Sequence, residues 1–358
     1  SEMQAQTKPA KTPGINVSLM DKSVRPQDDF FNFVNGDWLK KTEIPSDRTR
    51  WGSFDELRQN TDNDALAILK EAAGNPKYTS NTDQGKAVGL YLTILDTITR
   101  NKQGIAPLKP YLSKIDKVKS VRDLQALLIE MEPIGGLGFF GVGVGTDAKN
   151  SNRNVVNLGL GGVGLPDRDY YVSDDADSKE KREKYVTHVA RMLQFLGEKP
   201  AKAKTDAVKI LALETEMSVP RLDRVERRDR RKTYNPMTVA DLQKLTPSIN
   251  WTTYLTGVGL KNIDSLIVSQ PKYMTALETI FKENKVEDWK AYMRWSILRS
   301  SSSELSTDIE AANFDFYGKT LTGAISQRPR EERALQMVNG ATGEALGKLY
   351  VEKKFPAE

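Results

Sequence analysis

The chain has 358 residues, of which 38% are hydrophobic and 28% are charged, a composition typical of a globular protein with one large lobe or two to three domains. Its net charge of +5 is too small to predict binding to nucleic acid, and no apolar run approaches the roughly 20 residues of a membrane-spanning helix. Because the chain has no cysteine, disulfides, thiolate zinc sites and thiol nucleophiles are excluded.

The N-terminal region combines a polar lead-in with an aromatic segment. Residues 1–15 are rich in Lys, Gln and Thr and lack the apolar stretch of a signal peptide, so we expect a flexible lead-in. Within the aromatic segment, Asn35-Gly36 predicts a turn or a close backbone approach. Its aromatic residues are expected to be core side chains: Phe30, Phe31, Phe33 and Trp38.

Helical periodicity begins at residue 53. Ser53 and Glu56 have the spacing of a capping box, and the apolar pattern continues to a stop at Gly74-Asn75-Pro76, which predicts a helix of about five turns. A second helical stretch is expected to end near Gly104, with one face formed by Val88, Tyr91, Leu92, Leu95 and Ile98.

A third, shorter helix is predicted to open at Ser120, with Asp123 in the capping position. Two runs of alternating residues, 137–145 and 154–160, follow it and are joined by a segment rich in Asp, Asn and Ser. They predict a β-hairpin. The glycines of the first run do not indicate a phosphate-binding loop, because the final Lys-Ser/Thr of that motif is missing.

Helical patterns occupy most of the remaining chain up to residue 305. In the last of them, Trp289, Met293 and Ile297 recur every four residues, which is typical of core packing. The fold class is therefore predicted to be mainly α, with a small hairpin near 137–160. The expected later helices are 178–198, 204–222, a short helix initiated by Thr238, 272–284 and 286–305.

Catalytic residues and metal ligands are not predicted in this chain. Its one histidine, His188, is expected on a helix surface or half-buried. A zinc-peptidase helix needs two histidines one turn apart, whereas Met192 lies four positions after His188. Residues 300–303 are all serine and lack the glycines of a nucleophile elbow, and the pair Glu214 and Glu216 is of a kind too common to indicate glycoside hydrolysis.

Two charged clusters are expected to be structural. The run 221–232 is rich in arginine but contains Asp223, Glu226 and Asp229, which indicates a solvated surface with local ion pairs. The acidic cluster around Asp174 lacks the alternating donors of a calcium loop and is expected at a helix N-terminus, where negative charge is favoured.

Three blocks of sequence are informative in their order and approximate spacing: Asp28–Leu39 with Ile44-Pro45 and Arg50–Arg58, then Gly164–Tyr171, then Val338-Asn339-Gly340 running into Gly347–Pro356. They resemble neprilysin-type zinc metallopeptidases. The resemblance covers nearly the whole chain and is that of the non-catalytic N-terminal part of such an enzyme, whose zinc ligands lie downstream of the position of Glu358. It implies no chemical role for Leu165–Tyr171, and the family's tryptophan after Pro329-Arg330 is replaced here by Glu331.

The resemblance implies a two-lobed, mainly helical peptidase in which a large helical lobe caps a zinc-carrying lobe around an internal cavity that admits peptides. Residues 28–358 are expected to form most of the capping lobe, which would be incomplete in this chain. Residues 1–27 are expected to be an extended lead-in that packs on the catalytic lobe.

The resemblance also suggests a substrate-binding site. In the family, a segment similar to Arg50-Trp51-Gly52-Ser53-Phe54 places its arginine on the cavity wall, at the C-terminal side of the bound peptide. Arg50 and Arg58 are therefore expected to bind substrate, with Asp55 orienting them, because a planar guanidinium grips a carboxylate or carbonyl well. The alternative is that both arginines are surface residues paired with local carboxylates.

The function implied is that of a zinc metalloendopeptidase that hydrolyses oligopeptides outside the cytoplasm of a bacterium, in the periplasm or at the surface. This chain alone is expected to be inactive, since zinc and the catalytic residues would belong to a C-terminal half, in the same or a separate polypeptide. The alternative is a non-catalytic helical peptide-binding or structural surface protein. A His-Glu-x-x-His helix beyond Glu358 would discriminate the two.

Overall fold

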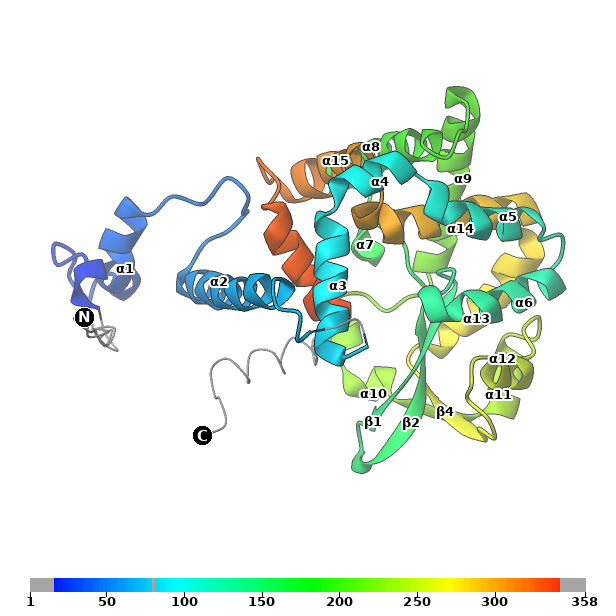
Figure 1. Cartoon of the computed structure of the whole chain (residues 1–358). Coiled ribbons are helices and arrows are strands. Elements are labelled where there is room, and N and C mark those ends of the chain that lie inside the picture. Colours follow the sequence, from blue (N-terminus) through cyan, green and yellow to red (C-terminus); the bar gives the residue numbers. More distant parts are fainter. Residues whose placement is uncertain (1–15, 79–80, 342–358) are drawn as a thin grey trace.

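The computed structural model describes residues 16–78 and 81–341. Figure 1 shows a body of packed helices with a small sheet on one side, and helix α1 (Phe30–Lys41) lies apart from this body. The predicted mainly-α fold with a hairpin is confirmed. The Gly347–Pro356 block of the resemblance lies outside the described residues.

The regular elements of the described residues are mostly helices, with four strands among them. Directly after α15, a π-helix spans Asp315–Thr320, and residues 330–341 are also helical. The strands are β1 (Phe140–Asp147), β2 (Asn150–Leu160), β3 (Asn235–Thr238) and β4 (Ser265–Val268). The other helices are α2 (Ser53–Ala73), α3 (Asp83–Leu95), α4 (Thr97–Gln103), α5 (Lys109–Asp116), α6 (Val121–Met131), α7 (Arg168–Val172), α8 (Ala176–Gln194), α9 (Pro200–Ser218), α10 (Arg230–Thr233), α11 (Val239–Leu245), α12 (Trp251–Gly257), α13 (Pro271–Glu283), α14 (Val286–Ser301) and α15 (Thr307–Phe314).

Helix α1 differs from its prediction. Phe30 and Phe31 are exposed rather than in the core, and Phe33 and Trp38 are half-buried, because α1 lies apart from the body. Asn35-Gly36 forms no turn and continues the helix. The predicted close approach is present, since a Cβ on Gly36 would lie 2.5 Å from Cβ of Asp21.

The predicted helix at 53–73 is confirmed, but its capping box is wrong. The N-cap is Gly52, so Ser53 already lies inside the first turn and makes no cap bond. Glu56 instead accepts hydrogen bonds from the indole nitrogens of Trp38 at 3.1 Å and Trp51 at 3.3 Å. Glu56 therefore connects α1 to the start of α2.

The stretch predicted as one helix up to Gly104 is divided at Asp96. The Asp96 side chain accepts from the backbone N–H of Thr99 at 3.0 Å and caps α4, which begins on a new axis. Ile98 is consequently exposed and does not continue the face of α3. The cap predicted at Ser120 is confirmed, because Ser120 Oγ accepts from the N–H of Asp123 at 3.2 Å.

The later helices begin and end within a few residues of the predicted ranges. Helix α8 starts at an N-cap, Asp175, from the acidic cluster expected there, and ends before Gly197, whose φ is +92°. Helix α9 starts earlier than predicted because Pro200 suits the first turn of a helix. Thr238 caps α11 as expected, by accepting from the N–H of Asp241 at 3.0 Å.

The hairpin is part of a larger sheet with the strand order β1-β2-β4-β3. Strands β1 and β2 are antiparallel, with Val144 opposite Val156, and β4 runs parallel to β2. Strands β3 and β4 have only four residues each, and the sequence pattern did not predict them. The sheet packs against the helices through the buried side chains of Val156, Leu158 and Val268.

Buried apolar side chains form two separate clusters in the described residues. The larger fills the body between α5 and the π-helix and contains fully buried Trp251, Tyr273 and Trp295. The smaller joins α2, α3 and the helix at 330–341, and its members include Leu69, Tyr91 and Leu335. Figure 1 shows these three helices side by side. Residues from both ends of the chain thus share the smaller cluster.

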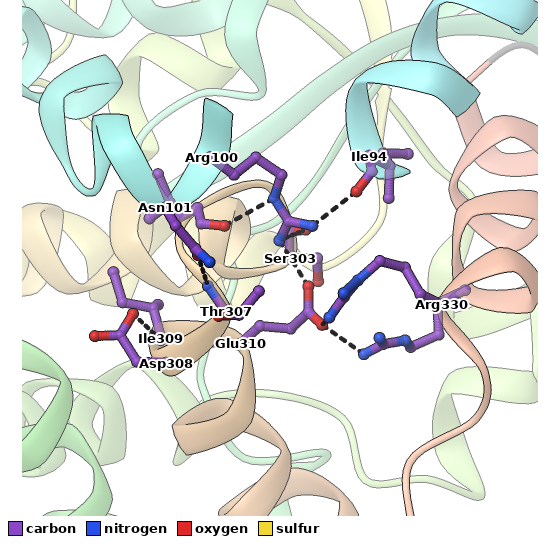
Figure 2. Close-up of polar contacts among 11 residues, drawn as sticks. Ile94, Arg100, Asn101, Ser303, Thr307, Asp308, Ile309, Glu310 and Arg330 are labelled. Carbon is purple, nitrogen blue, oxygen red and sulfur yellow. Dashed lines mark hydrogen bonds and ion pairs between the residues drawn. The ribbon is translucent and has the colours of Figure 1, made fainter. Parts of the chain in front are cut away.

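A buried ionic node connects α15, which contributes Ile309 to the larger cluster, with the helix at 330–341, which contributes Leu335 to the smaller one. Figure 2 shows its polar contacts. The carboxylate of Glu310, on α15, accepts from Nη2 of Arg100 at 2.6 Å, Nη2 of Arg330 at 2.9 Å and Nη1 of Arg333 at 2.6 Å. Arg100, at 4% exposure, completes its bonding by donating at 2.8 Å to three backbone carbonyls, those of Ile94, Ser303 and Leu305. One carboxylate therefore holds α4, α15 and the helix at 330–341 together.

Candidate functional site

The predicted site residues lie at the start of α2. Arg50 precedes the helix, Asp55 is in its first turn and Arg58 in its second. Arg50 Nε lies 4.0 Å from Asp55 Oδ1, and the Arg50 side chain is 83% exposed. The acidic first turn of α2 is favourable next to the positive end of the helix dipole. Asp55 is thus the charged neighbour of Arg50, and Arg58 is exposed on the same helix.

All three residues line one cavity of about 460 Å³. Its opposite wall comes from the C-terminal part of the described chain and includes Phe314, Gly318, Gln327 and Arg328. The structure therefore brings the three predicted residues together and adds a second wall, which is distant from them in sequence.

A network of side chains missed by the sequence reasoning ties the two walls together. Arg48 Nη2 donates to Gln59 Oε1 at 2.5 Å and contacts Glu332 Oε2 at 3.5 Å, and Gln59 Nε2 donates to Glu332 Oε1 at 3.0 Å. The carbonyl of Ser46 accepts from the N–H groups of Ile325 and Ser326 at 3.0 Å each. Arg48 and Gln59 are only 11 residues apart, but the partners that cross between the walls are more than 270 residues apart in sequence, so no local spacing pattern could have revealed them.

The apolar part of the second wall depends on a glycine in the π-helix. A Cβ on Gly318 would lie 2.0 Å from Cε2 of Phe314, so the ring of Phe314 lies directly against the glycine backbone. Both residues line the cavity. π-Helical turns recur at functional sites because they re-aim side chains within a helix. Here Phe314 and Gly318 together give the cavity an apolar surface.

Gly318→Ala is expected to destabilise the chain by about 1–3 kcal/mol, because the new methyl group must displace the Phe314 ring. Thermal unfolding measures this. Gly89→Ala is the matched control, since Gly89 lies within α3 with nothing within 4 Å of its added Cβ. There alanine's higher helix propensity is expected to stabilise slightly. Equal melting temperatures for Gly318→Ala and the wild type would contradict this account of the wall.

A second buried cluster involves the Gly164–Tyr171 segment, to which the family resemblance assigns no chemical role. Glu214, on α9, is fully buried and accepts from the N–H of Gly164 at 2.6 Å and from the hydroxyl of Tyr185. The Tyr171 hydroxyl accepts from the N–H of Leu165 at 2.9 Å. Burial raises the pKa of Glu214 to about 7, although the hydrogen bond from Tyr185 and the nearby Arg299 act in the opposite direction. This cluster is structural and lies away from the cavity lining.

His188 was expected to be at least half exposed, and this prediction is wrong. Its side chain is only 5% exposed, and its ring stacks on Phe316 with the centroids 4.9 Å apart. Burial, reinforced by Arg191, lowers the pKa of His188 to about 3, so the imidazole is neutral at pH 7. The packing of the π-helix onto α8 accounts for this burial, and helical periodicity alone did not reveal it.

The two remaining sequence predictions concern charge and metal. The expected local ion pairs of the basic run are confirmed by Arg231–Asp229 at 3.1 Å and Lys232–Glu226 at 3.1 Å.

Over residues 16–78 and 81–341, no group of three or more His, Cys, Asp or Glu side chains is arranged to hold a metal ion. The described residues therefore do not fit a zinc site. In the same part of the chain, no helix has the length and apolar character needed to cross a membrane.

Comparison with known proteins places these features in context. A model of a family described as "Peptidase family M13" matches residues 26–358. Rat endothelin-converting enzyme 1 is 26% identical over 95% of this chain and 45% of its own length, and mouse neprilysin is 28% identical over 96% and 49%. The chain thus spans about half the length of these curated relatives.

Solved structures agree with the sequence matches. The inhibitor complex of the Mycobacterium tuberculosis zinc metalloprotease Zmp1 has a TM-score of 0.88 at 34% identity, covering 97% of this chain and 53% of that one. The open state of the same protease has a TM-score of 0.80 at 35% identity, covering 93% and 52%. PepO from Lactobacillus rhamnosis shares the fold, with a TM-score of 0.78 at 18% identity over 93% and 52%.

Proposed function

This chain belongs to peptidase family M13, and from that premise we propose that it is the peptide-recognising part of a zinc-dependent metalloendopeptidase that hydrolyses oligopeptides. Arg50 and Arg58 are proposed to bind the peptide, and Asp55 to orient Arg50. The observation that carries the proposal is their convergence on one cavity, at the beginning of one helix and opposite a wall with an apolar part formed by Phe314 and Gly318. Guanidinium groups at such a position suit the carbonyl and carboxylate oxygens of a peptide.

Zinc and the catalytic groups are proposed to come from the region that the relatives have beyond the matched half. Residues 28–358 would then be a capping lobe, and 1–27 a lead-in that packs on the catalytic lobe. The apolar side chains exposed in the N-terminal part of the chain support such a contact: Phe30, Phe31, Phe54 and Leu57 are 63–83% exposed. Burying them against another lobe would be favourable, at about 25 cal/mol per Å² of apolar surface.

The catalytic half is proposed to act together with this chain outside the cytoplasm of a bacterium, in the periplasm or at the surface. The support for this location is the resemblance of the whole chain to the family. The matched Zmp1 structures show that the family occurs in bacteria.

Arg50→Ala is expected to weaken the binding of a short peptide to the chain by roughly tenfold, the size of one lost charge-assisted hydrogen bond. Isothermal titration with a hexapeptide measures the effect. Arg122→Ala is the matched control, because Arg122 is also exposed but lies on α6 outside the cavity lining. Equal affinities for the Arg50→Ala chain and the wild type would count against the proposed site. Peptide binding without any hydrolysis when the catalytic half is present would favour the alternative of a non-catalytic binding protein.

A further inference from the structure

Arg328 is an arginine of the cavity that the family resemblance did not single out. It lies on the second wall, between the π-helix and the helix at 330–341, and its side chain is half-buried. In the described part of the chain it makes no hydrogen bond and no ion pair. Arg330 and Arg333, its neighbours in sequence, behave differently, because both donate to Glu310 in the buried node.

The other charges of the cavity leave a positive excess. Arg48 is engaged by Gln59 and Glu332, and Arg50 lies near Asp55. Arg58, like Arg328, has no ion-pair partner within residues 16–78 and 81–341. Two guanidinium groups from segments 270 residues apart in sequence thus line the same space without an anion.

The acidic residues of the lining do not neutralise this pair. Asp62 accepts from Gln336 Nε2 at 3.2 Å, Asp55 is the neighbour of Arg50, and Asp47 is the neighbour of Arg48. A half-buried guanidinium has lost part of its hydration, and no acceptor in the described part of the chain replaces the lost hydrogen bonds of Arg328. A carboxylate would supply the missing hydrogen bonds, because it can accept two parallel N–H···O bonds from a single arginine.

We propose that Arg328 is a specificity-determining residue that, together with Arg58, binds a carboxylate of the peptide in this cavity. The proposal rests on the peptide-binding function proposed above and adds the substrate class, peptides that place a negative charge between the two walls. The carboxylate is either the peptide's C-terminus or an acidic side chain near it. The apolar surface of Phe314 and Gly318 lies beside it and suits the adjoining part of the peptide.

The test uses this chain and four hexapeptides of otherwise identical sequence, with a free or amidated C-terminus and with Glu or Gln at the penultimate position. Titration calorimetry of the wild type is expected to show tighter binding of at least one peptide that carries a carboxylate than of the uncharged one. Arg328→Gln is expected to lose roughly tenfold or more in affinity for those peptides and to bind the uncharged peptide like the wild type. The peptide that loses affinity identifies which carboxylate is bound.

Two further variants distinguish an affinity loss caused by the missing charge from one caused by a change in the fold. Arg328→Lys keeps the charge and is expected to recover part of the lost affinity, whereas Arg122→Ala is expected to bind like the wild type. The melting temperature of Arg328→Gln is expected to be unchanged, because Arg328 makes no bond within the described chain. If Arg328→Gln weakens the uncharged peptide as much as the charged ones, the proposal is overturned.

The remaining outcomes distinguish the two proposals. If Arg328→Gln leaves all four affinities unchanged while Arg50→Ala weakens them, the role of Arg328 is overturned and the peptide site stands. If none of the peptides binds the wild-type chain, the peptide site and the role of Arg328 are both overturned.

Discussion

Replacing Glu310 by alanine is expected to destabilise the folded chain by about 3–5 kcal/mol, because it leaves buried arginines without their counter-charge. Glu310 is 7% exposed and Arg100 4% exposed, whereas the side chains of Arg330 and Arg333 are 30% and 22% exposed, so the cost of the lost carboxylate is expected to fall mainly on Arg100. The effect is expected to be largest in the smaller core, since Arg330 and Arg333 belong to the helix that contributes Leu335 to it. Urea unfolding measures the total loss, and amide hydrogen exchange locates it.

Glu180→Ala is the matched control for this change. Glu180 pairs with Lys184 at 2.8 Å one turn away on α8, and both side chains are more than half exposed. Such surface pairs contribute at most about 0.5 kcal/mol. Glu310→Gln, which keeps the acceptor oxygen and loses the charge, is expected to lie between the two variants. Similar stabilities for Glu310→Ala and Glu180→Ala would show that the node does not hold the helices together.

Glu214→Gln is expected to stabilise the chain relative to the wild type more strongly as the pH rises from about 4.5 to 7. The folded pKa of Glu214 is raised to about 7 from its ordinary value of 4.5. In this range the folded wild type therefore holds a proton that the unfolded chain has released, and its free energy of unfolding falls with rising pH. The amide cannot titrate, so the difference between the two proteins should grow by on the order of 3 kcal/mol and level off above pH 7.

The comparison must be made between the two proteins, since His188 contributes an opposite slope. Its folded pKa of about 3 lies below the ordinary value of 6.5, so the unfolded chain binds the extra proton and stability rises with pH between these values. This contribution is common to the wild type and Glu214→Gln and cancels in the difference. Urea unfolding at pH 4.5, 5.5, 6.5 and 7.5 gives the four points needed. A difference independent of pH would mean that Glu214 titrates normally in the fold.

The elements that the sequence predicted well are those whose own pattern specifies them. Helices such as α13 and α14 carry a continuous apolar stripe, and the alternation in β1 and β2 is long enough to be unambiguous. The predictions failed where burial or secondary structure depends on contacts with other segments of the chain. Phe30 and Phe31 are apolar but belong to a helix that lies apart from the body, and β3 and β4 become strands through their pairing in the sheet.

The candidate site was predictable only on one wall. Arg50, Asp55 and Arg58 fall within nine residues, so a sequence motif can name them. Arg328 and Glu332 reach the cavity and Gln59 through folding over some 270 residues, and nothing in their local sequence marks them. Glu214 was set aside as one of many acids, because its complete burial depends on Tyr185 and Gly164 from other segments.

The separation of the two apolar clusters also bears on how this sequence can change over time. Residues in different clusters, such as Leu69 and Trp295, share no packing partner within either core, and distant substitutions of this kind combine additively. Each cluster can therefore drift in sequence without compensating changes in the other. Glu310 has no such freedom, because a single substitution there must be accommodated at once by three arginines from two separate segments.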